Sequence, residues 1–291
     1  MFPENFDTGI YKNLNKDLKK LEDKQLITHY LIHGKKEGRI CCDVTNRETL
    51  KKYIDTNNLD CLEIGPFDCP VLRGSKVKYF DVLNKKDLIE RSKKCGRKNH
   101  VSGIPYIDYV DSKGNLRIVK EKFDIVLSCH SIEHQVDLIK HLNDVSMILK
   151  PKGKYVIIIP DKRFCFDHFL PETTIAEIID KNSQNRTFHT LKSVIEHRSL
   201  TCHNDTLRHW KGDHGKQSFE NNPHLIKKSI EEYQLNMKQN SYLDVHSFQF
   251  FPDSFSQIIH LLNVNKYINL REERIYQTTY GKNEFYVVLS L

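Results

Sequence analysis

The sequence has no apolar run long enough to cross a membrane and no cysteine pattern typical of a metal site. Its longest apolar runs are short, such as YVIII at residues 155–159, whereas a membrane-spanning helix needs about 20 residues. The eight cysteines include no C-x-x-C pair. The N-terminus also lacks the basic and apolar regions of a signal peptide. We therefore expect a cytoplasmic protein without a membrane span, whose cysteines are reduced thiols.

Recognisable nucleic-acid-binding elements are missing too, although the chain is basic. Its 45 Lys and Arg residues against 38 Asp and Glu residues give a net charge of +7. No RNP-like, zinc-finger or arginine-rich element accompanies this charge, so a lysine-rich solvated surface explains it more simply. We predict that nucleic acid is not a partner. The 291 residues, 38% of them apolar, are enough to bury the core of one large domain with a small appendage.

From residue 60 onward, strand-like and helix-like segments alternate along the chain. Apolar, β-branched runs of this kind are typical of parallel strands that are covered on both faces. Residues 136–153 carry a helical apolar stripe between two such runs, which predicts a βαβ unit. Near the C-terminus, residues 267–278 and 284–291 flank the turn YGKN and predict an antiparallel hairpin. The four strand-like runs are residues 60–64, 77–82, 123–129 and 154–160.

Two segments stand outside this alternation. Residues 1–45 are predicted to form a small helical module, and residues 46–291 to form the main domain. Within the main domain, residues 161–252 interrupt the pattern and contain eight of the fifteen histidines. An insertion of this length is too long for a simple connection, so we expect it to form a cap on the substrate side of the sheet.

The loop after the first predicted strand, in CLEIGPFDCPVL (residues 61–72), has a single glycine. Dinucleotide-binding loops have two or three glycines at this point. Pro66 follows Gly65 and has no backbone N–H to offer a phosphate. The pattern therefore argues against a dinucleotide, and an ordinary junction between a strand and a turn remains the alternative.

Taken together, these segments resemble the class I S-adenosylmethionine-dependent methyltransferases of the methyltransferase type 11-like kind. LEIGP (62–66) resembles the family's first motif, and residues 123–134 and 149–160 resemble its fourth- and fifth-strand motifs. The resemblance implies an α/β, Rossmann-like fold with a mostly parallel seven-stranded sheet and a C-terminal antiparallel hairpin. It also implies S-adenosylmethionine as the cofactor, which has no phosphate to wrap and so tolerates a loop with one glycine.

The resemblance places the cofactor at the carboxyl ends of the first strands. Asp81 stands where the family has an acid on the ribose hydroxyls, and Glu63 is expected to hold the donor's amino group through water or to organise the loop. Asp68 is an alternative polar contact. The adenine contact is open between Asp108 and Asp111, in a segment that also suits a plain turn. The predicted cofactor contacts are Glu63, Gly65, Pro66, Phe67, Asp68, Asp81, Val82, Asp108, Ser128, Cys129 and His130.

Methyl transfer to a hydroxyl needs an aligned acceptor and a base, because the donor is already activated. Histidine is the usual base near neutral pH. His130 and His134 follow the fourth strand, at the edge where open α/β sheets bind ligands. Each is expected to act as the base or to contact the substrate, with a capping or packing role as the alternative. The predicted catalytic residues are His134, His130, Asp161 and His168.

Three blocks of the insertion, residues 160–169, 203–215 and 244–255, combine charged and aromatic side chains. They resemble a subgroup of these methyltransferases encoded beside glycan-building enzymes, which implies a carbohydrate or nucleotide-sugar acceptor. Charged groups suit sugar hydroxyls, and aromatic rings suit the apolar face of a sugar. The predicted substrate contacts are Lys162, Arg163, His209, Trp210 and His246.

The same blocks leave two interpretations of their acids and histidines open. In one, they hold Mg²⁺ or another divalent metal, which binds a vicinal diol and lowers the pKa of a hydroxyl. In the other, they form a hydrogen-bonded network without a metal. The predicted ligands of the first interpretation are Asp161, Asp213, His214, Asp244 and His246.

Residues 6–39 resemble a short helical module attached to glycosyltransferases, with a closing motif from His29 to Arg39. The resemblance implies a role in glycan biosynthesis, with glycosyltransferases as partners. We therefore predict an S-adenosylmethionine-dependent O-methyltransferase that acts on a sugar hydroxyl. The alternatives are a methyltransferase for a small metabolite, a lipid or a protein, and a non-catalytic module that binds the cofactor or a glycan in a larger assembly.

Overall fold

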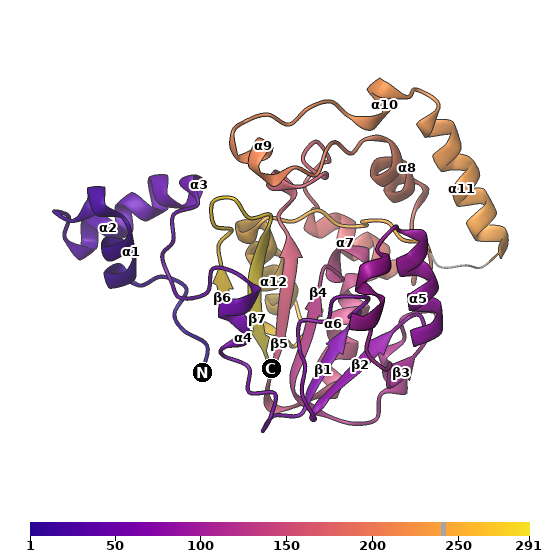
Figure 1. Ribbon diagram of the computed structural model, residues 1–291, viewed down its shortest axis with the longest axis horizontal. Helices are drawn as coiled ribbons and strands as arrows, with labels where there is room; N and C mark the ends of the chain where they lie inside the picture. Colours follow the sequence, from indigo (N-terminus) through magenta and orange to yellow (C-terminus); the bar gives the residue numbers. More distant parts are fainter. Residues whose placement is uncertain (240–242) are drawn as a thin grey trace.

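A computed structural model of the chain describes residues 1–239 and 243–291 (Figure 1). The described residues contain one seven-stranded sheet, with the strand order β3-β2-β1-β4-β5-β7-β6. The first five strands are parallel, and β7 runs antiparallel between β5 and β6. The bounds are β1 Cys61–Ile64, β2 Val77–Asp81, β3 Tyr109–Val110, β4 Phe123–Cys129, β5 Leu149–Pro160, β6 Arg271–Tyr276 and β7 Glu284–Ser290.

Helices cover both faces of this sheet and extend beyond its upper edge (Figure 1). No described helix is both long enough and apolar enough to cross a membrane. The helices are α1 Thr8–Leu14, α2 Asp23–His29, α3 Lys35–Glu37, α4 Arg47–Lys51, α5 Lys85–Lys94, α6 Leu138–Ile148, α7 Ile175–Ser183, α8 Leu191–Ser199, α9 Thr206–Trp210, α10 Ser218–Asn221, α11 Leu225–Gln239 and α12 Pro252–Val264.

The central strands are apolar on both faces because each face has its own core. On β5, Ile157 and Ile159 belong to one core, together with side chains of α6 and α12. Val156 and Ile158 point to the other core, which includes side chains of α4, α5 and the N-terminal helices. Successive residues of a strand point to opposite faces, so a strand buried on both sides reads as a continuous apolar run. This confirms the mostly parallel sheet with a C-terminal antiparallel pair that the sequence predicts.

Two local details differ from the predicted elements. Helix α6 ends at Ile148, just before the predicted stop signals, but β5 begins at Leu149, where it pairs with Phe123, and not at the predicted residue 154. The residues between them, including Pro151 and Gly153, belong to the strand and not to a helix end. The edge strand β3 is only two residues long, which is too short for any periodicity to reveal it.

The predicted insertion, residues 161–252, leaves the carboxyl end of β5 and returns to the sheet at α12. Its helices α8, α9, α10 and α11 lie beyond the carboxyl ends of the parallel strands, as the strand arrows in Figure 1 show. Asp161 and Phe250, near the two ends of the insertion, form a β-bridge. The insertion therefore closes on itself above the edge of the sheet where open α/β proteins bind ligands.

The N-terminal helices α1 to α3 form a lobe beside the sheet (Figure 1). The backbone of Gly38 joins this lobe to the main domain: its carbonyl accepts a hydrogen bond from the N–H of Tyr280, at 2.9 Å. Gly38 has a positive φ of 63°, and a Cβ there would lie 2.6 Å from Trp210 of the cap. The lobe, the hairpin turn and the cap therefore meet at a position that only glycine fits without strain.

Candidate active site

The loop after β1 is held in shape by Glu63. This side chain is buried, and its two carboxylate oxygens accept hydrogen bonds from the backbone N–H groups of Val71 and Leu72, both at 2.8 Å. Burial raises the pKa of Glu63 to about 7, against the lowering effect of these two hydrogen bonds. Of its two predicted roles, the structure gives Glu63 the organisation of the loop.

The turn itself uses the left-handed region of the backbone twice. Gly65 has a φ of 68° and Phe67 a φ of 44°. A Cβ on Gly65 would meet only Ser131, at 3.6 Å or more, so the glycine is required by its backbone angle and not by crowding. Gly65 lies at the carboxyl end of β1, beside the end of β4 in the sheet.

Asp81 ends β2, the neighbour of β1 in the sheet. It is 6% exposed, and its Oδ1 accepts a hydrogen bond from the N–H of Leu83. Burial raises its pKa to about 6, and the nearby Arg91 opposes that shift. A buried carboxylate at a strand end is a suitable acceptor for the two hydroxyls of a ribose. The residues at this edge therefore fit S-adenosylmethionine.

Two other predicted cofactor acids are already engaged elsewhere. Asp68 is buried, accepts a hydrogen bond from the hydroxyl of Ser92 at 3.0 Å and pairs with Arg97 at 3.0 Å. Asp108 accepts the backbone N–H of Tyr79 at 2.9 Å. Both carboxylates therefore hold loops against the sheet. Asp111 accepts two backbone N–H groups of its own turn, as in the plain turn that the sequence left open.

The remaining predicted cofactor contacts lie at the same strand ends. Ser128 is fully buried, and its hydroxyl is hydrogen-bonded to Tyr155, which also contacts His141. Its side chain therefore belongs to the core, so a cofactor contact would fall to its backbone. Burial raises the pKa of the neighbouring Cys129 well above its usual value. Pro66 and Val82 flank Gly65 and Asp81 directly along the chain.

His130 follows β4 and has a positive φ of 47°, which is uncommon outside glycine. Its Nε2 lies 2.9 Å from a carboxylate oxygen of Glu284, the first residue of β7. Glu284 also accepts hydrogen bonds from Arg47 and from the hydroxyl of Tyr286. Burial alone would raise the pKa of Glu284, but its bonds to His130 and Arg47 lower it to about 2. The imidazole is thus fixed by an ionised carboxylate at the open edge of the sheet.

His134 ends a short 3₁₀ turn after β4 and faces the cap. Its Nδ1 lies 3.0 Å from Asp244, which also pairs with Arg91 of α5. Burial alone would lower the pKa of His134, but Asp244 and Glu133 outweigh it and raise the pKa. The ring of His246 stands edge-on to that of His134, with centroids 4.6 Å apart. The structure therefore brings together His134, Asp244 and His246, three of the predicted site residues.

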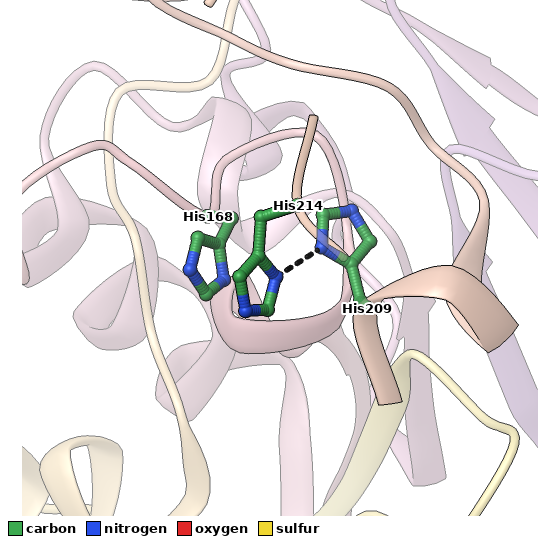
Figure 2. A group of neighbouring side chains, drawn as sticks. All are labelled: His168, His209 and His214. Carbon is green, nitrogen blue, oxygen red and sulfur yellow. Dashed lines mark hydrogen bonds between the residues drawn. The ribbon is translucent and has the colours of Figure 1, made fainter. Parts of the chain in front are cut away.

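Three further histidines form a stack in the cap (Figure 2). His168 lies flat on His214, with ring centroids 3.5 Å apart and planes 8° apart, and Nδ1 of His214 lies 3.0 Å from Nδ1 of His209. The other nitrogen of His209 donates to the carbonyl of His203, and Nδ1 of His168 donates to that of Arg163. His168 and His209, predicted as catalytic and substrate-binding residues, thus contribute to the packing of the cap.

The five predicted metal ligands do not form one group. Asp161 is fully buried and is held by Arg163 at 2.6 Å and by the hydroxyl of Thr278 at 2.6 Å. Asp213 is exposed and pairs with Arg208. Within the described ranges, neither acid belongs to a group of three ligand atoms within 4.8 Å of one another. Each acid is instead paired with an arginine of its own segment. The other three predicted ligands are His214, in the cap stack, and Asp244 and His246, beside His134.

Trp210 and Lys162 hold the cap in place. The Trp210 ring stacks on Phe164 with centroids 3.7 Å apart, and its Nε1 donates to the carbonyl of Lys282. The ammonium of Lys162 donates to the carbonyl of His168. One face of the Trp210 ring is thus already covered. A separate pocket of about 530 Å³ lies in the cap, and its lining is Cys202, His203, Arg208, Gly215, Lys216, Ser218 and Asn221.

Comparison with known proteins identifies a methyltransferase-like region in the chain. Residues 70–157, which run from the loop before β2 almost to the end of β5, match a family described as a methyltransferase domain. The match spans just under a third of the chain. The strand order, with β7 antiparallel between β5 and β6, is that of the class I methyltransferases. The chain has the class I methyltransferase fold. Together, the match and the strand order support S-adenosylmethionine-dependent methyl transfer.

Solved methyltransferase structures resemble the chain only distantly. An S-adenosylmethionine-dependent methyltransferase from Clostridium acetobutylicum ATCC 824 has 11% identity and a TM-score of 0.40, covering 97% of this chain and 96% of that one. The CcbJ methyltransferase from Streptomyces caelestis has 9% identity, coverage of 84% and 92%, and a TM-score of 0.39. Magnesium protoporphyrin IX methyltransferase from Synechocystis PCC 6803 has 8% identity, coverage of 84% and 80%, and a TM-score of 0.37. No curated protein matches the sequence. Likenesses this weak carry no inference about the acceptor.

Several residues of this candidate site were not predicted from the sequence. Glu284 carries a signal in hindsight, since it is the one acid in the otherwise apolar strand EFYVVLS. Arg47 begins α4, more than two hundred residues before its partner Glu284, and no local pattern points to it. Glu133 and Asp167 contact His246 from separate segments, so only the folded chain reveals that they belong together.

Proposed function

We propose that the chain is an S-adenosylmethionine-dependent O-methyltransferase that acts on a sugar hydroxyl of a glycan or nucleotide-sugar. The observation that carries this proposal is the imidazole–carboxylate pair of His130 and Glu284, at the same edge of the sheet as the turn at Gly65 and the buried acid Asp81. When bound, S-adenosylmethionine supplies an activated methyl group. A hydroxyl acceptor must then lose its proton, and a positioned imidazole is suited to take it.

The roles of the residues follow from their contacts. Asp81 accepts the ribose hydroxyls, and the turn from Gly65 to Phe67 receives the rest of the donor. Because Nε2 of His130 is held by Glu284, the Nδ1 atom carries the lone pair and takes the proton of the acceptor hydroxyl. Glu284 then stabilises the imidazolium that forms, as the carboxylate partner of a catalytic histidine does.

The cap favours a polar acceptor. Its pocket is lined by Arg208, Lys216 and His203 together with small polar side chains, a set that suits the hydroxyls of a sugar and the phosphates of a nucleotide-sugar. The resemblance of the N-terminal lobe to modules of glycosyltransferases is consistent with a glycan context and with glycosyltransferases as partners. An apolar lipid would offer no hydrogen-bonding groups to this polar lining.

Calorimetry with S-adenosylmethionine, followed by a labelled-methyl assay on a panel of nucleotide-sugars and oligosaccharides, tests the proposal. We expect donor binding and transfer of label to a hydroxyl of one acceptor. Absence of donor binding would overturn the enzyme. Donor binding without transfer to any acceptor would instead favour a non-catalytic module, and transfer to nitrogen or carbon would refute the choice of oxygen.

A further inference from the structure

Glu133 is a buried acid without a hydrogen-bond partner. It lies in the turn after β4, its side chain is 1% exposed, and neither carboxylate oxygen accepts a hydrogen bond from any residue that the structure describes. Leaving a buried polar group unsatisfied costs about 1–3 kcal/mol, and more if it is charged. The described contacts of Glu133 are ion-pair contacts with two histidines, and they leave both carboxylate oxygens without a hydrogen-bond donor.

Two imidazole nitrogens face this carboxylate. Nε2 of His134 lies 3.6 Å and Nε2 of His246 lies 3.8 Å from Oε1 of Glu133, too far for hydrogen bonds. The three residues offer ligand atoms that all lie within 4.8 Å of one another. Tetrahedral ligands at the usual zinc distances are separated by about 3.4 Å. The two distances from Oε1 of Glu133 exceed this spacing by only a few tenths of an ångström.

The opposite nitrogen of each ring faces a second acid. Nδ1 of His246 donates to Asp167 at 2.6 Å, and Nδ1 of His134 lies 3.0 Å from Asp244. A carboxylate at Nδ1 keeps the proton on that nitrogen and leaves the lone pair on Nε2, which points toward Glu133. Histidines that bind metals are oriented in this way by acids in the next layer.

The two rings also do not stack face to face. The planes of His134 and His246 stand at 89°. The cap stack of His168 and His214 provides the contrast, because its planes are 8° apart and its in-plane nitrogens run parallel (Figure 2). A ring in that stack would have to turn before both histidines could bind the same ion.

We propose that Glu133, His134 and His246 bind a divalent transition metal such as Mn²⁺ or Zn²⁺. Two imidazoles and one carboxylate form a ligand set that suits these ions better than Mg²⁺ and leaves further coordination positions open. We assign the open coordination positions to the oxygen atoms of a hydroxyl or vicinal diol of the acceptor, an assignment that rests on the proposed function. The ion lowers the pKa of that hydroxyl, and His130 takes its proton. His134 is then a metal ligand and not the base.

Metal binding is tested directly on the full-length chain after removal of bound ions with a chelator. Titration with Mn²⁺, followed by electron paramagnetic resonance, is expected to show one equivalent bound by the wild type. We expect Glu133→Gln and His246→Asn to lose at least about tenfold in affinity, and the cap variant His209→Gln to keep it. Glu133→Gln removes a buried charge at constant volume, so its melting temperature without metal should be equal to or above that of the wild type.

Two results would overturn the site: no stoichiometric metal binding by the wild type, or affinity that survives in Glu133→Gln but is lost in His209→Gln. The test is separable from that of the proposed function, because metal affinity is measured without donor or acceptor. If the chain binds the metal but no S-adenosylmethionine, the proposed function fails and the site stands. If Glu133→Gln methylates its acceptor as fast as the wild type, with or without metal, the catalytic role of the ion is refuted.

Discussion

Replacing Asp81 with Asn should strengthen the fold and weaken donor binding at once. In the folded chain, burial raises the pKa of Asp81 from 3.8 to about 6. Each pKa unit corresponds to about 1.4 kcal/mol, so at about pH 8 the ionised side chain destabilises the fold by about 3 kcal/mol. Asn has the same shape, keeps an acceptor for the N–H of Leu83 and carries no charge. We therefore expect the free energy of unfolding to rise by up to about 3 kcal/mol.

The size of this stabilisation depends on pH in a defined way. Because the folded pKa lies above the unfolded one, the folded chain holds a proton on Asp81 between about pH 4 and pH 6 that the unfolded chain has released. Raising the pH through this window lowers the stability of the wild type relative to the variant. The advantage of Asp81→Asn should thus be absent below about pH 4 and complete above about pH 6.

Donor affinity should change in the opposite direction. Asn offers one acceptor where the carboxylate offers two to the ribose hydroxyls, a loss of about 1–3 kcal/mol in binding. Urea denaturation at both ends of the pH window and calorimetry with S-adenosylmethionine measure the two effects. Asp68→Asn is the matched control: its acid is equally buried but paired with Arg97, so it should lose stability and keep donor affinity. A less stable Asp81→Asn with an unchanged dissociation constant would refute the reasoning.

Three further variants test other parts of the site and fold. Glu284→Gln removes the charge that positions His130. We expect turnover to fall by a factor of about 10²–10⁴, with the donor affinity measured by calorimetry unchanged. Full turnover would exclude the pair from catalysis. Gly65→Val forces a side chain into the left-handed region of the backbone. We expect the free energy of unfolding, measured by urea denaturation, to fall by about 1–2 kcal/mol and donor binding to weaken. A neutral result would show that the turn can relax. Gly38→Ala places a Cβ 2.6 Å from Trp210, so its melting temperature should fall, and an unchanged melting temperature would mean that the lobe does not depend on this contact.

The fold was predictable because local patterns of apolar residues indicate most of its strands and helices. Continuous apolar runs gave the central strands, and β4, Phe123–Cys129, has the predicted bounds. The hairpin at the C-terminus was visible from two runs on either side of YGKN. The edge strand β3 was not, because two residues carry no period. The end of helix α6 before Lys150 agrees with the prediction, but β5 begins before the predicted residues 154–160, because Pro151 and Gly153, which usually follow a helix, here lie in its extended start.

For the site, only the strand ends at which its residues lie could be predicted from the sequence. That His130 and His134 lie at the ligand edge follows from their position after β4. Their partners do not follow, since Glu284 and Asp244 are more than one hundred residues away along the chain. Acids such as Asp161 look like ligands in the sequence, but whether a carboxylate is open to a ligand depends on the arginine that reaches it. Partner geometry of this kind exists only after the cap has folded over the sheet.

Methyl transfer itself is tested most directly by following both products of one reaction. The chain is incubated with methyl-labelled S-adenosylmethionine, Mn²⁺ and a panel of nucleotide-sugars and oligosaccharides, and S-adenosylhomocysteine and labelled acceptor are measured by mass spectrometry. We predict equal amounts of the two, with the label on a hydroxyl oxygen, and a large decrease of both in Glu284→Gln. No S-adenosylhomocysteine, or S-adenosylhomocysteine without a methylated acceptor, would contradict the assignment of this site.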